Sequence, residues 1–516
     1  MMKNLVIFLF SMLLGSFVLK AQQQEVDITQ INVPNEQVLY KIDDATGKII
    51  YLPDAYGNII PDFSKVGYKK GSALPNVETK ITLNPSGKDD TQAIERAINS
   101  IAKMPLNLNG FRGALLLKKG TYFVSKTITL VDSGIVIRGE GSSDLGTIII
   151  ATKKEEHDLF VVGKKENYQR EKGKKRRILG DYIPVGTTKL TLASTKGLKV
   201  GDLITVLRPS TSKWIRHIGM DKIEPREDGR AIKQWLPGKY DLTYERTITA
   251  ISQNTITIDI PLVSPLEKKY GGAYVYKTQI RGRVHNIGFE NLKLKSIYET
   301  GQENADEDHA WNAILFDYAE NAWAQNIICH HFAKSCVSVG KRAKFITVNE
   351  CKYLEPVSKI MGRRRYSFSV QGQMTLVKNC YSNGGRHDYI TNSRVPGPNV
   401  FYNCKAENTH SDSGPHSRWA TGTLYDNVEV ETFKIQNRGN FGSGHGWSGA
   451  WEIVWNCTAE NACIQKPPTA NNYVFGFIGK KSKCRFPEED AYWFSYGEHV
   501  NPRSLYLKQL EDNRSN

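Results

Sequence analysis

The sequence predicts an all-β protein built as a parallel β-helix, with an N-terminal capping helix and an inserted antiparallel β-subdomain. Its 516 residues are 40% hydrophobic and 24% charged and contain no low-complexity tract, which excludes a disordered or collagen-like chain. An amphipathic helix near residue 90 is followed by short apolar strands separated by Gly and Lys turns. From about residue 285, similar strands recur at intervals in the twenties and thirties, a period that fits stacked coils.

The N-terminus predicts export. Lys3 precedes an apolar run over residues 5–19, which is short for a membrane span and ends at Lys20 and Ala21. We therefore expect residues 1–21 to be a cleaved signal peptide and the mature protein to be secreted or periplasmic. The 69 basic and 53 acidic residues give a charge of +16, and losing Lys3 and Lys20 leaves +14. A polyanion is the expected partner, and export favours an acidic oligosaccharide or polysaccharide over nucleic acid or a membrane.

The elements follow in order along the chain. Asp89 to Gln92 is an Asp-x-x-Gln variant of the capping box, and it opens a helix whose apolar side includes Ile94, Ile98 and Ile101. The stretches 190–192, 197–206 and 247–260 predict antiparallel strands that interrupt the coils. We expect an irregular region over 22–80, the first coils over 81–151, the inserted subdomain over 152–275, coils carrying the active groove over 276–465 and a C-terminal cap over 466–516.

An asparagine marks each predicted coil after residue 285. The spacings between these residues are 35, 23, 30, 24, 24 and 29, so equivalent side chains should stack in a ladder at one turn: Asn291, Asn326, Asn349, Asn379, Asn403, Asn427 and Asn456. Five of the eight cysteines follow a ladder Asn by one to three residues: Cys329, Cys351, Cys380, Cys404 and Cys457. Because no C-x-x-C pair occurs, a stack of small buried side chains is favoured over a metal site, and export permits one or two disulfides.

Basic, His and aromatic residues fall in register about 7 to 18 residues past the ladder positions. On stacked coils they should line one long face, which would form a basic groove with aromatic edges. Four of the eleven His lie in these segments, although any single one of them could simply solvate a loop. The set comprises Lys359, Arg363, Arg364, Arg365, Tyr366, Arg386, His387, Asp388, Tyr389, Arg394, His410, Asp412, His416, Arg418, Trp419, Arg438 and His445.

Two glycan chemistries could use such a groove. In β-elimination at a uronic acid, a cation neutralises the carboxylate, a base removes the C5 proton and an acid assists departure from C4. Hydrolysis needs two carboxylates that flank the bond, and the groove set offers only Asp388 and Asp412, each embedded among His and Arg. Elimination fits better, with a glycoside hydrolase and a non-catalytic glycan-binding β-helix as the alternatives.

Specific roles follow from proximity across coils. We predict His410 as the base, His416 and Arg418 as carboxylate neutraliser or proton donor, and Tyr366 or Tyr389 as the alternative base, with His387 in the same catalytic set. The predicted substrate-binding residues are Lys359, Arg363, Arg364, Arg365, Arg394, Trp419, Arg438, His445 and Trp447.

Two further segments carry residue types that could bind a ligand. The run from Asp306 to His309 could offer oxygens to Ca²⁺, but consecutive residues rarely converge on one ion, so a solvated loop is favoured. The glycine-rich segment 442–447 lacks the Lys of a P-loop. It is interpreted as a close approach of backbone to substrate with Trp447 as a sugar platform, or as a plain turn with Trp447 packed below. We expect no cofactor and no metal.

Several motifs resemble a known superfamily. Gly87 to Ile94, Gly120 to Tyr122 and the coil pattern resemble the pectate-lyase-like right-handed β-helix superfamily over most of residues 80–465. Segments 362–368, 386–389, 410–422 and 444–449 are similar to a group among bacterial polysaccharide-degradation proteins that includes the ulvan-oligosaccharide dehydratases of marine ulvan degradation. The resemblance implies a right-handed helix and a carbon-oxygen lyase that releases water or a sugar from C4 of a uronic acid in a sulfated, ulvan-type glycan. The Ca²⁺-binding Asp cluster of pectate lyases has no clear match, and hydrolases share this scaffold.

Overall fold

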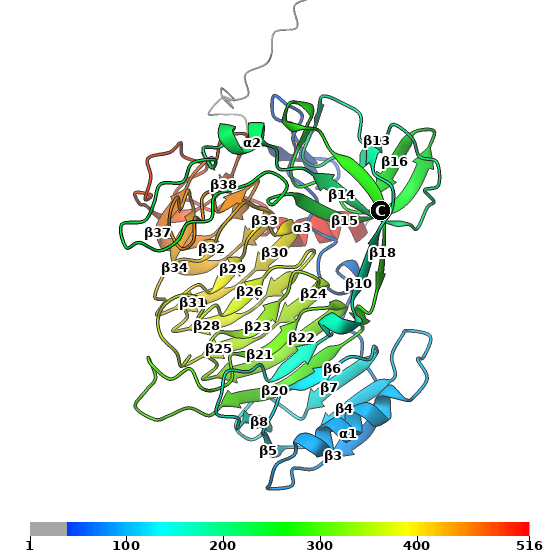
Figure 1. Ribbon diagram of the computed structural model, residues 1–516, viewed down its shortest axis with the longest axis vertical. Coiled ribbons are helices and arrows are strands. Elements are labelled where there is room, and N and C mark those ends of the chain that lie inside the picture. The colour runs from blue at the N-terminus through cyan, green and yellow to red at the C-terminus, as the bar shows by residue number, and fades with distance from the viewer. Residues whose placement is uncertain (1–38, 515–516) are drawn as a thin grey trace, which may run out of the picture.

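The chain winds into a right-handed parallel β-helix, as the sequence predicts (Figure 1). The structure is a computed structural model that describes residues 39–514, so the expected signal peptide lies outside the described residues. Three columns of parallel strands run along the helix, and we call them the first, second and third faces in the order in which each coil passes through them.

The first face contains the longest column of strands. Its parallel pairing continues from β3 to β40, so the stack extends from residue 79 to residue 494. Its strands are β3 (Thr79–Leu83), β4 (Gly113–Leu117), β7 (Ile135–Gly139), β19 (Val284–His285), the first parts of β20 (Gly288–Ser296) and β22 (Ala319–His330), β24 (Lys344–Asn349), β27 (Leu376–Lys378), β30 (Pro396–Tyr402), β33 (Ala420–Asp426), β35 (Gly449–Ala450), β36 (Ile453–Trp455), β38 (Tyr473–Phe475) and β40 (Tyr492–Phe494).

The second and third faces complete each coil. The second contains β5 (Gly120–Val124), β8 (Thr147–Ala151), the last parts of β20 and β22, β25 (Lys352–Leu354), β28 (Tyr381–Asn383), β31 (Lys405–Glu407), β34 (Glu429–Ile435), β37 (Thr458–Ile464) and β39 (Ile478–Lys481). The third contains β6 (Ile128–Leu130), β9 (Phe160–Val162), β21 (Asn312–Phe316), β23 (Ser335–Val339), β26 (Phe368–Val370), β29 (Tyr389–Thr391) and β32 (Gly414–Pro415).

The predicted helix packs on the first coils. In α1 (Thr91–Ala102), Ile94, Ile98 and Ile101 are buried in the same apolar core as the inward-facing strand residues. The capping box does not form as predicted. Asp89 Oδ1 accepts the Thr91 backbone N–H at 2.9 Å, whereas Gln92 accepts from Arg96, one turn further along the helix.

The asparagine ladder is present at the corner between the first and second faces, which we call the first corner. Ladder residues here adopt left-handed backbone with φ near +50°, a conformation that Asn tolerates better than most residues. Asn326 donates to Asn291 at 2.8 Å, and Asn403 donates to Asn379 at 2.8 Å. One assignment needs correction, because Glu350 (φ +54°), not Asn349, occupies the left-handed position of its coil, although Asn379 still donates to Asn349 at 3.0 Å.

The last two ladder residues hold the C-terminal segment instead of each other. Asn427 donates to the carbonyl of Arg503 at 2.8 Å, and Asn456 donates to that of Val500 at 2.8 Å. The chain then ends in α3 (Leu505–Arg514). Next to the ladder lie four buried free thiols, as favoured from sequence: Cys351, Cys380 and Cys404 in three successive coils, and Cys457 two coils further on. The remaining four cysteines form the disulfides Cys329–Cys336 and Cys463–Cys484.

The inserted subdomain is an antiparallel sheet placed between β9 and β19. It begins later than residue 152, because β9 still belongs to the third face. Its strands are β10 (Gln169–Lys172), β11 (Arg176–Arg177), β13 (Lys189–Thr191), β14 (Leu203–Arg208), β15 (Leu242–Ser252), β16 (Thr255–Ile258) and β18 (Tyr274–Arg281), and the insertion also holds β12 (Tyr182–Ile183), β17 (Leu266–Glu267) and α2 (Ser212–His217).

A second apolar core joins this insertion to the coils. Trp214 and Trp235 from the insertion pack in it together with Trp419, Trp447 and Ile453. The N-terminal hairpin of β1 (Tyr40–Ile42) and β2 (Ile49–Tyr51) also contacts this core. The insertion is therefore fixed to the same coils that carry the predicted groove.

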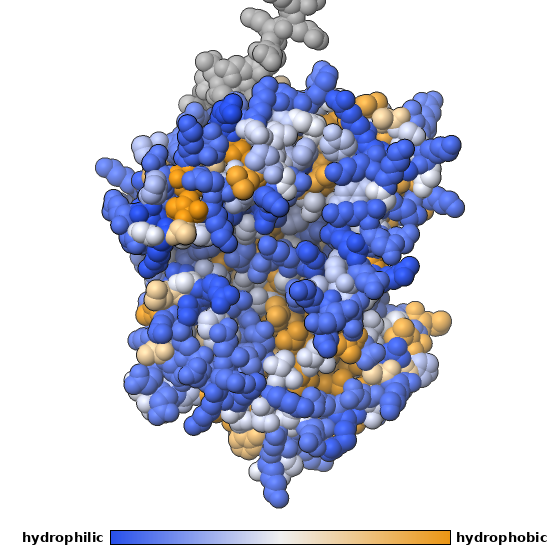
Figure 2. Space-filling view, in the orientation of Figure 1, coloured by the Kyte–Doolittle hydropathy of each residue, from blue (hydrophilic) through white to orange (hydrophobic). Residues whose placement is uncertain are grey.

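The surface is mostly hydrophilic, in agreement with the negative mean hydropathy of −0.43. The face shown in Figure 2 is mostly hydrophilic, with smaller apolar patches. Within residues 39–514, none of the helices has the length and apolar character that crossing a bilayer would require.

Candidate active site

The candidate site is built on the corner between the second and third faces, which we call the second corner. Four left-handed or glycine positions stack here in successive coils: His331, Glu355, Gly384 and Asn408. After Glu355, Gly384 and Asn408, the loops 356–367, 385–388 and 409–413 lead to β26, β29 and β32 respectively. A fourth loop, 436–448, follows β34.

Three of these loops and the residue that follows β32 bring four ring side chains together, and we call Tyr366, His387, His416 and His445 the Tyr–His cluster. Phe368 pairs with Tyr389 in adjacent third-face strands, so Tyr366 and His387, each two residues upstream, lie side by side. The ring centroids of His387 and His416 are 4.6 Å apart, and those of His416 and His445 are 5.0 Å apart. The Tyr366 ring lies 5.2 Å from that of His387 and 5.4 Å from that of His416.

Hydrogen bonds define the proton positions in the cluster. Arg386 donates to Tyr366 Oη at 3.3 Å, and the phenol lies within hydrogen-bond distance of His416 Nε2, 3.2 Å away, to which it donates when that nitrogen is unprotonated. His387 Nδ1 donates to the backbone carbonyl of Asp412 at 2.7 Å, because a carbonyl can only accept. His387 Nε2 is therefore left with a lone pair.

Burial keeps the histidines neutral. It lowers the pKa of His387 to about 4 and that of His445 to about 3, and the nearby arginines add to the effect. The pKa of His416 is lowered well below its usual value by burial and then by His387 and Arg438. Burial alone would raise the pKa of Asp412, but His387 and Arg438, whose Nη1 is 3.3 Å from Asp412 Oδ2, lower it overall. The site thus combines neutral imidazoles with an ionised carboxylate.

Several buried polar atoms of the site have no hydrogen-bond partner among the described residues. Such atoms are uncommon in folded proteins, and here they are polar groups that a bound substrate could satisfy. They are His387 Nε2, His416 Nδ1, His445 Nδ1, Arg386 Nε and Arg438 Nε.

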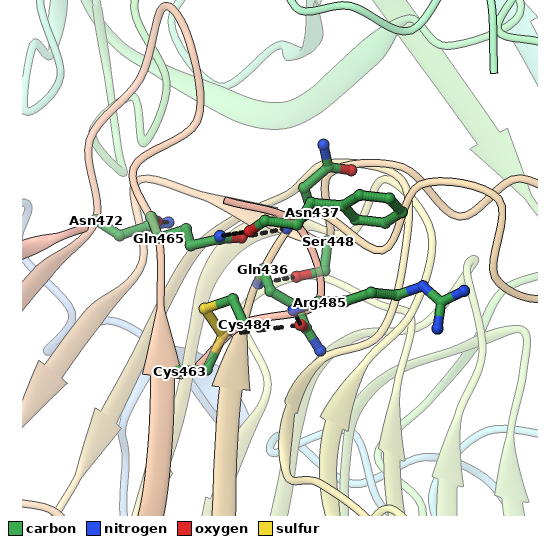
Figure 3. The surroundings of a disulfide bond; sticks show 9 residues. Gln436, Asn437, Ser448, Cys463, Gln465, Asn472, Cys484 and Arg485 are labelled. Carbon is green, nitrogen blue, oxygen red and sulfur yellow. Dashed lines mark hydrogen bonds between the residues drawn. A yellow bond between two sulfur atoms is a disulfide. The ribbon is translucent and has the colours of Figure 1, made fainter. Parts of the chain in front are cut away.

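Loop 436–448 is anchored at its base by a disulfide. Figure 3 shows Cys463–Cys484 beside Gln436, whose Oε1 accepts the backbone N–H of Arg485 at 3.3 Å. The backbone N–H of Gln436 in turn donates to Ser448 Oγ at 3.0 Å, which closes the two ends of the loop. The insertion contacts the other side of the loop, where Arg226 donates to the carbonyl of Asn440 at 3.3 Å. Arg438 and His445 are therefore held from two sides.

His410, the predicted base, does not join the cluster. Its side chain is exposed, and its Nε2 accepts from Arg365 Nη1 at 3.3 Å. Arg365 itself is buried and donates to the carbonyl of Ser358 at 2.8 Å and to Asn304 Oδ1 at 2.7 Å. His410 thus lies next to Arg365, and the lone pair that a base would need is engaged by the guanidinium.

Three predicted aromatic residues face the interior. Tyr389 is fully buried and donates to the carbonyls of Cys380 and Lys405, so it is unsuited to act as a base. Trp419 packs against Trp214 with ring centroids 4.9 Å apart, and Trp447 donates to the carbonyl of Ile218 at 3.1 Å. These contacts with the insertion bury both Trp residues, so neither provides a sugar platform. Trp447 is packed, as in the alternative interpretation, but against the insertion and not only on the coil below.

Five of the predicted cations form two groups outside the cluster. Arg364 and Lys359 pair with Glu307, and Arg363 lies 5.8 Å from the Trp311 ring. The loop around Glu307 is therefore tied by ion pairs to the predicted groove. Arg394 lies over the Tyr240 ring of the insertion at 5.2 Å, and Arg418 donates to Ser443 Oγ of loop 436–448 at 2.8 Å.

Sequence reasoning places Arg386 and Asp412 in the groove but assigns neither of them a catalytic or binding role. Arg226 also influences the pKa of His445, although it lies more than 200 residues away on the insertion, and no sequence signal could have found it.

A pocket of about 530 Å³ lies elsewhere, between the N-terminal segment and the insertion. It is lined by residues such as Tyr51, Lys65, Thr188 and Asp259, and it contains none of the Tyr–His cluster.

No family model and no curated protein matches this sequence. Among solved structures, the chain is similar to the Gp54 tailspike of Acinetobacter baumannii bacteriophage AP22 in complex with capsular saccharide, with 12% identity, 79% of this chain and 66% of that chain covered, and a TM-score of 0.40. A mutant tailspike of E. coli bacteriophage HK620 in complex with a pentasaccharide shares 11% identity over 79% of this chain and 56% of its own, with a TM-score of 0.42. Pectate lyase Pel9A shares 9% identity over 83% of each chain, with a TM-score of 0.38. The chain thus spans less than two thirds of the length of these tailspikes.

Proposed function

We propose that this protein is a carbon-oxygen lyase that performs β-elimination at a uronic acid of an acidic oligosaccharide. One observation carries the proposal: neutral His387, with a free Nε2 lone pair, lies beside a tyrosine whose phenol contacts both Arg386 and His416. This arrangement supplies a base, a proton donor and cations within one buried cluster.

The residues suit the two proton transfers of the reaction. His387 Nε2 takes the C5 proton, the C5 electron pair forms the C4=C5 double bond, and the C4–O bond breaks. Tyr366 gives its proton to the departing oxygen, and Arg386 stabilises the phenolate that remains. The proton on His387 then returns to Tyr366 through His416 or solvent, so the enzyme regains its starting state.

The reaction also needs the substrate carboxylate to be neutralised, because this makes C5–H acidic. Arg386 Nε and Arg438 Nε are buried donors without a partner among the described residues, and both guanidiniums border the cluster. A planar carboxylate matches the hydrogen-bond geometry of guanidinium groups. We assign these two arginines to the substrate carboxylate.

The resemblance of the site segments favours a sulfated, ulvan-type substrate. The chain also carries exposed or half-buried cations near the site, including Arg363, Arg394 and Arg418, that could pair with sulfate groups. A dehydratase and a polysaccharide lyase use the same elimination and differ in whether water or a sugar leaves C4.

Hydrolysis is less well supported. Asp412 is held by Arg438, while Asp388 Oδ1 accepts from Ser367 at 2.6 Å and from Ser382 at 2.5 Å, and Asp388 is buried. The two carboxylates therefore do not present a free acid and base pair to a glycosidic bond.

The test is to incubate the purified protein with uronic-acid oligosaccharides from a sulfated glycan and follow ultraviolet absorbance and product mass. We expect an unsaturated-uronate band. Loss of one water identifies a dehydratase, cleavage with the band identifies a lyase, and cleavage without the band would contradict the proposal in favour of hydrolysis. His410→Asn serves as a matched control because it removes a nearby imidazole outside the cluster, and it should retain the band.

A further inference from the structure

A second His-containing group lies at the second corner, outside the Tyr–His cluster. β22 ends at His330 and β25 ends at Leu354, and these two residues pair in adjacent coils. The next residues, His331 and Glu355, therefore stack on each other, and both have left-handed backbone with φ of +68° and +49°. The proposed elimination uses none of these side chains.

Three side chains converge here on one point. His330 Nδ1 is 3.0 Å and His331 Nε2 is 3.2 Å from the same atom, Glu355 Oε2, and all three ligand atoms lie within 4.8 Å of one another. In a tetrahedral zinc site with bonds of about 2.0–2.2 Å, neighbouring ligand atoms are about 3.3 Å apart. The two N–O distances are close to that separation, and small side-chain shifts would admit an ion.

The surroundings suit a cation. The ring of Tyr298 packs against His331 with centroids 4.8 Å apart and limits its rotation. The two ammonium groups on the adjacent strand, Lys293 and Lys295, lie 2.5 Å and 3.9 Å from Asp144, whose charge offsets theirs. The two imidazoles are 15% and 22% exposed, whereas Glu355 is 69% exposed, so the open side of the group faces water.

We propose that His330, His331 and Glu355 bind one zinc-class divalent cation, with water completing its coordination. Two imidazoles and one carboxylate are borderline ligands that favour Zn²⁺ over Ca²⁺ or Mg²⁺, which prefer oxygen. The ion joins the coil of β22 to Glu355, where loop 356–367 begins. That loop carries Arg365 and Tyr366, so the ion fixes the start of the segment that positions the phenol.

The alternative is a purely hydrogen-bonded trio in which both imidazoles donate to Glu355. The two cases differ in metal binding, which can be measured on the full chain without any glycan. After treatment with a chelator, the protein is titrated with Zn²⁺ alone by calorimetry, and Co²⁺ is used as a spectroscopic probe of four-coordinate nitrogen and oxygen ligation.

We expect one equivalent of Zn²⁺ in the parent protein and a loss of about tenfold or more in affinity in both Glu355→Gln and His331→Asn, since even the partners behind metal ligands contribute about 10- to 100-fold. His499→Asn is the control, because it removes an exposed His that bonds to the carbonyl of Gly476 at 2.8 Å, near the C-terminal end. Zn²⁺ should also raise the melting temperature of the parent and of this control, but not of the two ligand variants.

Three outcomes would overturn the proposal: no bound equivalent in the parent, equal affinity in the parent and both ligand variants, or loss of binding in His416→Asn alone. The last result would place the ion in the Tyr–His cluster. The parent titration decides the matter by itself if a ligand variant fails to fold, which circular dichroism reports.

Discussion

The first and second corners of the β-helix use the same left-handed backbone but fill it with different side chains. At the first corner the residue is Asn in most coils after 285, and neighbouring amides bond to one another, as Asn403 does to Asn379. At the second corner it changes from His331 to Glu355, Gly384 and Asn408, and each is followed by a different loop. A column of one residue type forms its own hydrogen bonds and stabilises the coils. A column of different residue types leads into loops that carry the candidate catalytic residues.

This comparison predicts that changes beyond the second corner reduce activity and leave the fold intact. Tyr366→Phe should show the largest effect, because it removes the proton that Tyr366 gives and the contact with Arg386 but keeps the ring. We expect a rate loss of about 10²- to 10⁴-fold with an unchanged melting temperature. Steady-state rates of unsaturated-uronate formation measure it, and a rate within a few-fold of the parent would remove Tyr366 from the mechanism.

Acid should destabilise the site region through its buried histidines. The pKa of His387 is about 4 in the folded protein and about 6.5 when unfolded, so the unfolded chain binds more protons between these values. Stability is therefore complete above pH 6.5 and falls as the pH drops toward 4, by about 3 kcal/mol for this residue. Urea unfolding at a series of pH values should show a shallower slope in His387→Asn than in the parent.

A buried carboxyl of the first face, Glu452 between β35 and β36, should destabilise the fold at alkaline pH instead of acid pH. Burial raises the pKa of Glu452 to about 8, so its stability contribution is present below about pH 4.5 and is lost as the pH rises through 8. Glu452→Gln keeps the size of the side chain and should flatten the alkaline side of the same profile. An unchanged alkaline limb would show that Glu452 does not stay protonated in the fold.

Substitutions in the asparagine ladder should lower the free energy of unfolding and leave the elimination rate unchanged. Asn379 has φ +53° and joins two amide hydrogen bonds, so Asn379→Ala loses both bonds and strains the backbone, at a cost of about 2–3 kcal/mol. Asn379→Gly keeps the left-handed backbone and loses only the bonds, so it should cost less. Unfolding free energies of the two variants separate backbone from side chain, and equal costs would show that the left-handed strain is negligible. At temperatures where both variants are folded, their elimination rates should match the parent.

The sequence was sufficient for most of the ladder and for placing Tyr366 and His387 on neighbouring coils, because both depend on the repeat alone, but it misplaced the left-handed residue at Asn349. It was insufficient for His410 and His416, which lie six residues apart. His410 precedes β32 and His416 follows it, so only the course of the chain around this strand decides which imidazole reaches Tyr366. Trp419 shows the other limit, since its burial depends on Trp214, from an insertion about 200 residues away. Local repeats are readable from sequence, whereas contacts between a repeat and an insertion are not.

The smallest effect should come from the cations at the edge of the site. Arg364 is paired with Glu307, and Arg418 is bonded to Ser443, so both are held near the groove but outside the cluster. In the Arg364→Ala, Arg418→Ala double variant we expect KM for an anionic oligosaccharide to rise roughly tenfold or less at low salt, because partly exposed charge pairs are weak. The difference should shrink as salt screens the charges, while kcat and the melting temperature change little. The matched control, Arg96→Ala with Arg177→Ala, removes the same charge from exposed positions outside the groove set and should leave KM unchanged. If both double variants shift KM equally, net charge and not the position of Arg364 and Arg418 attracts the substrate, and the second corner alone defines the site.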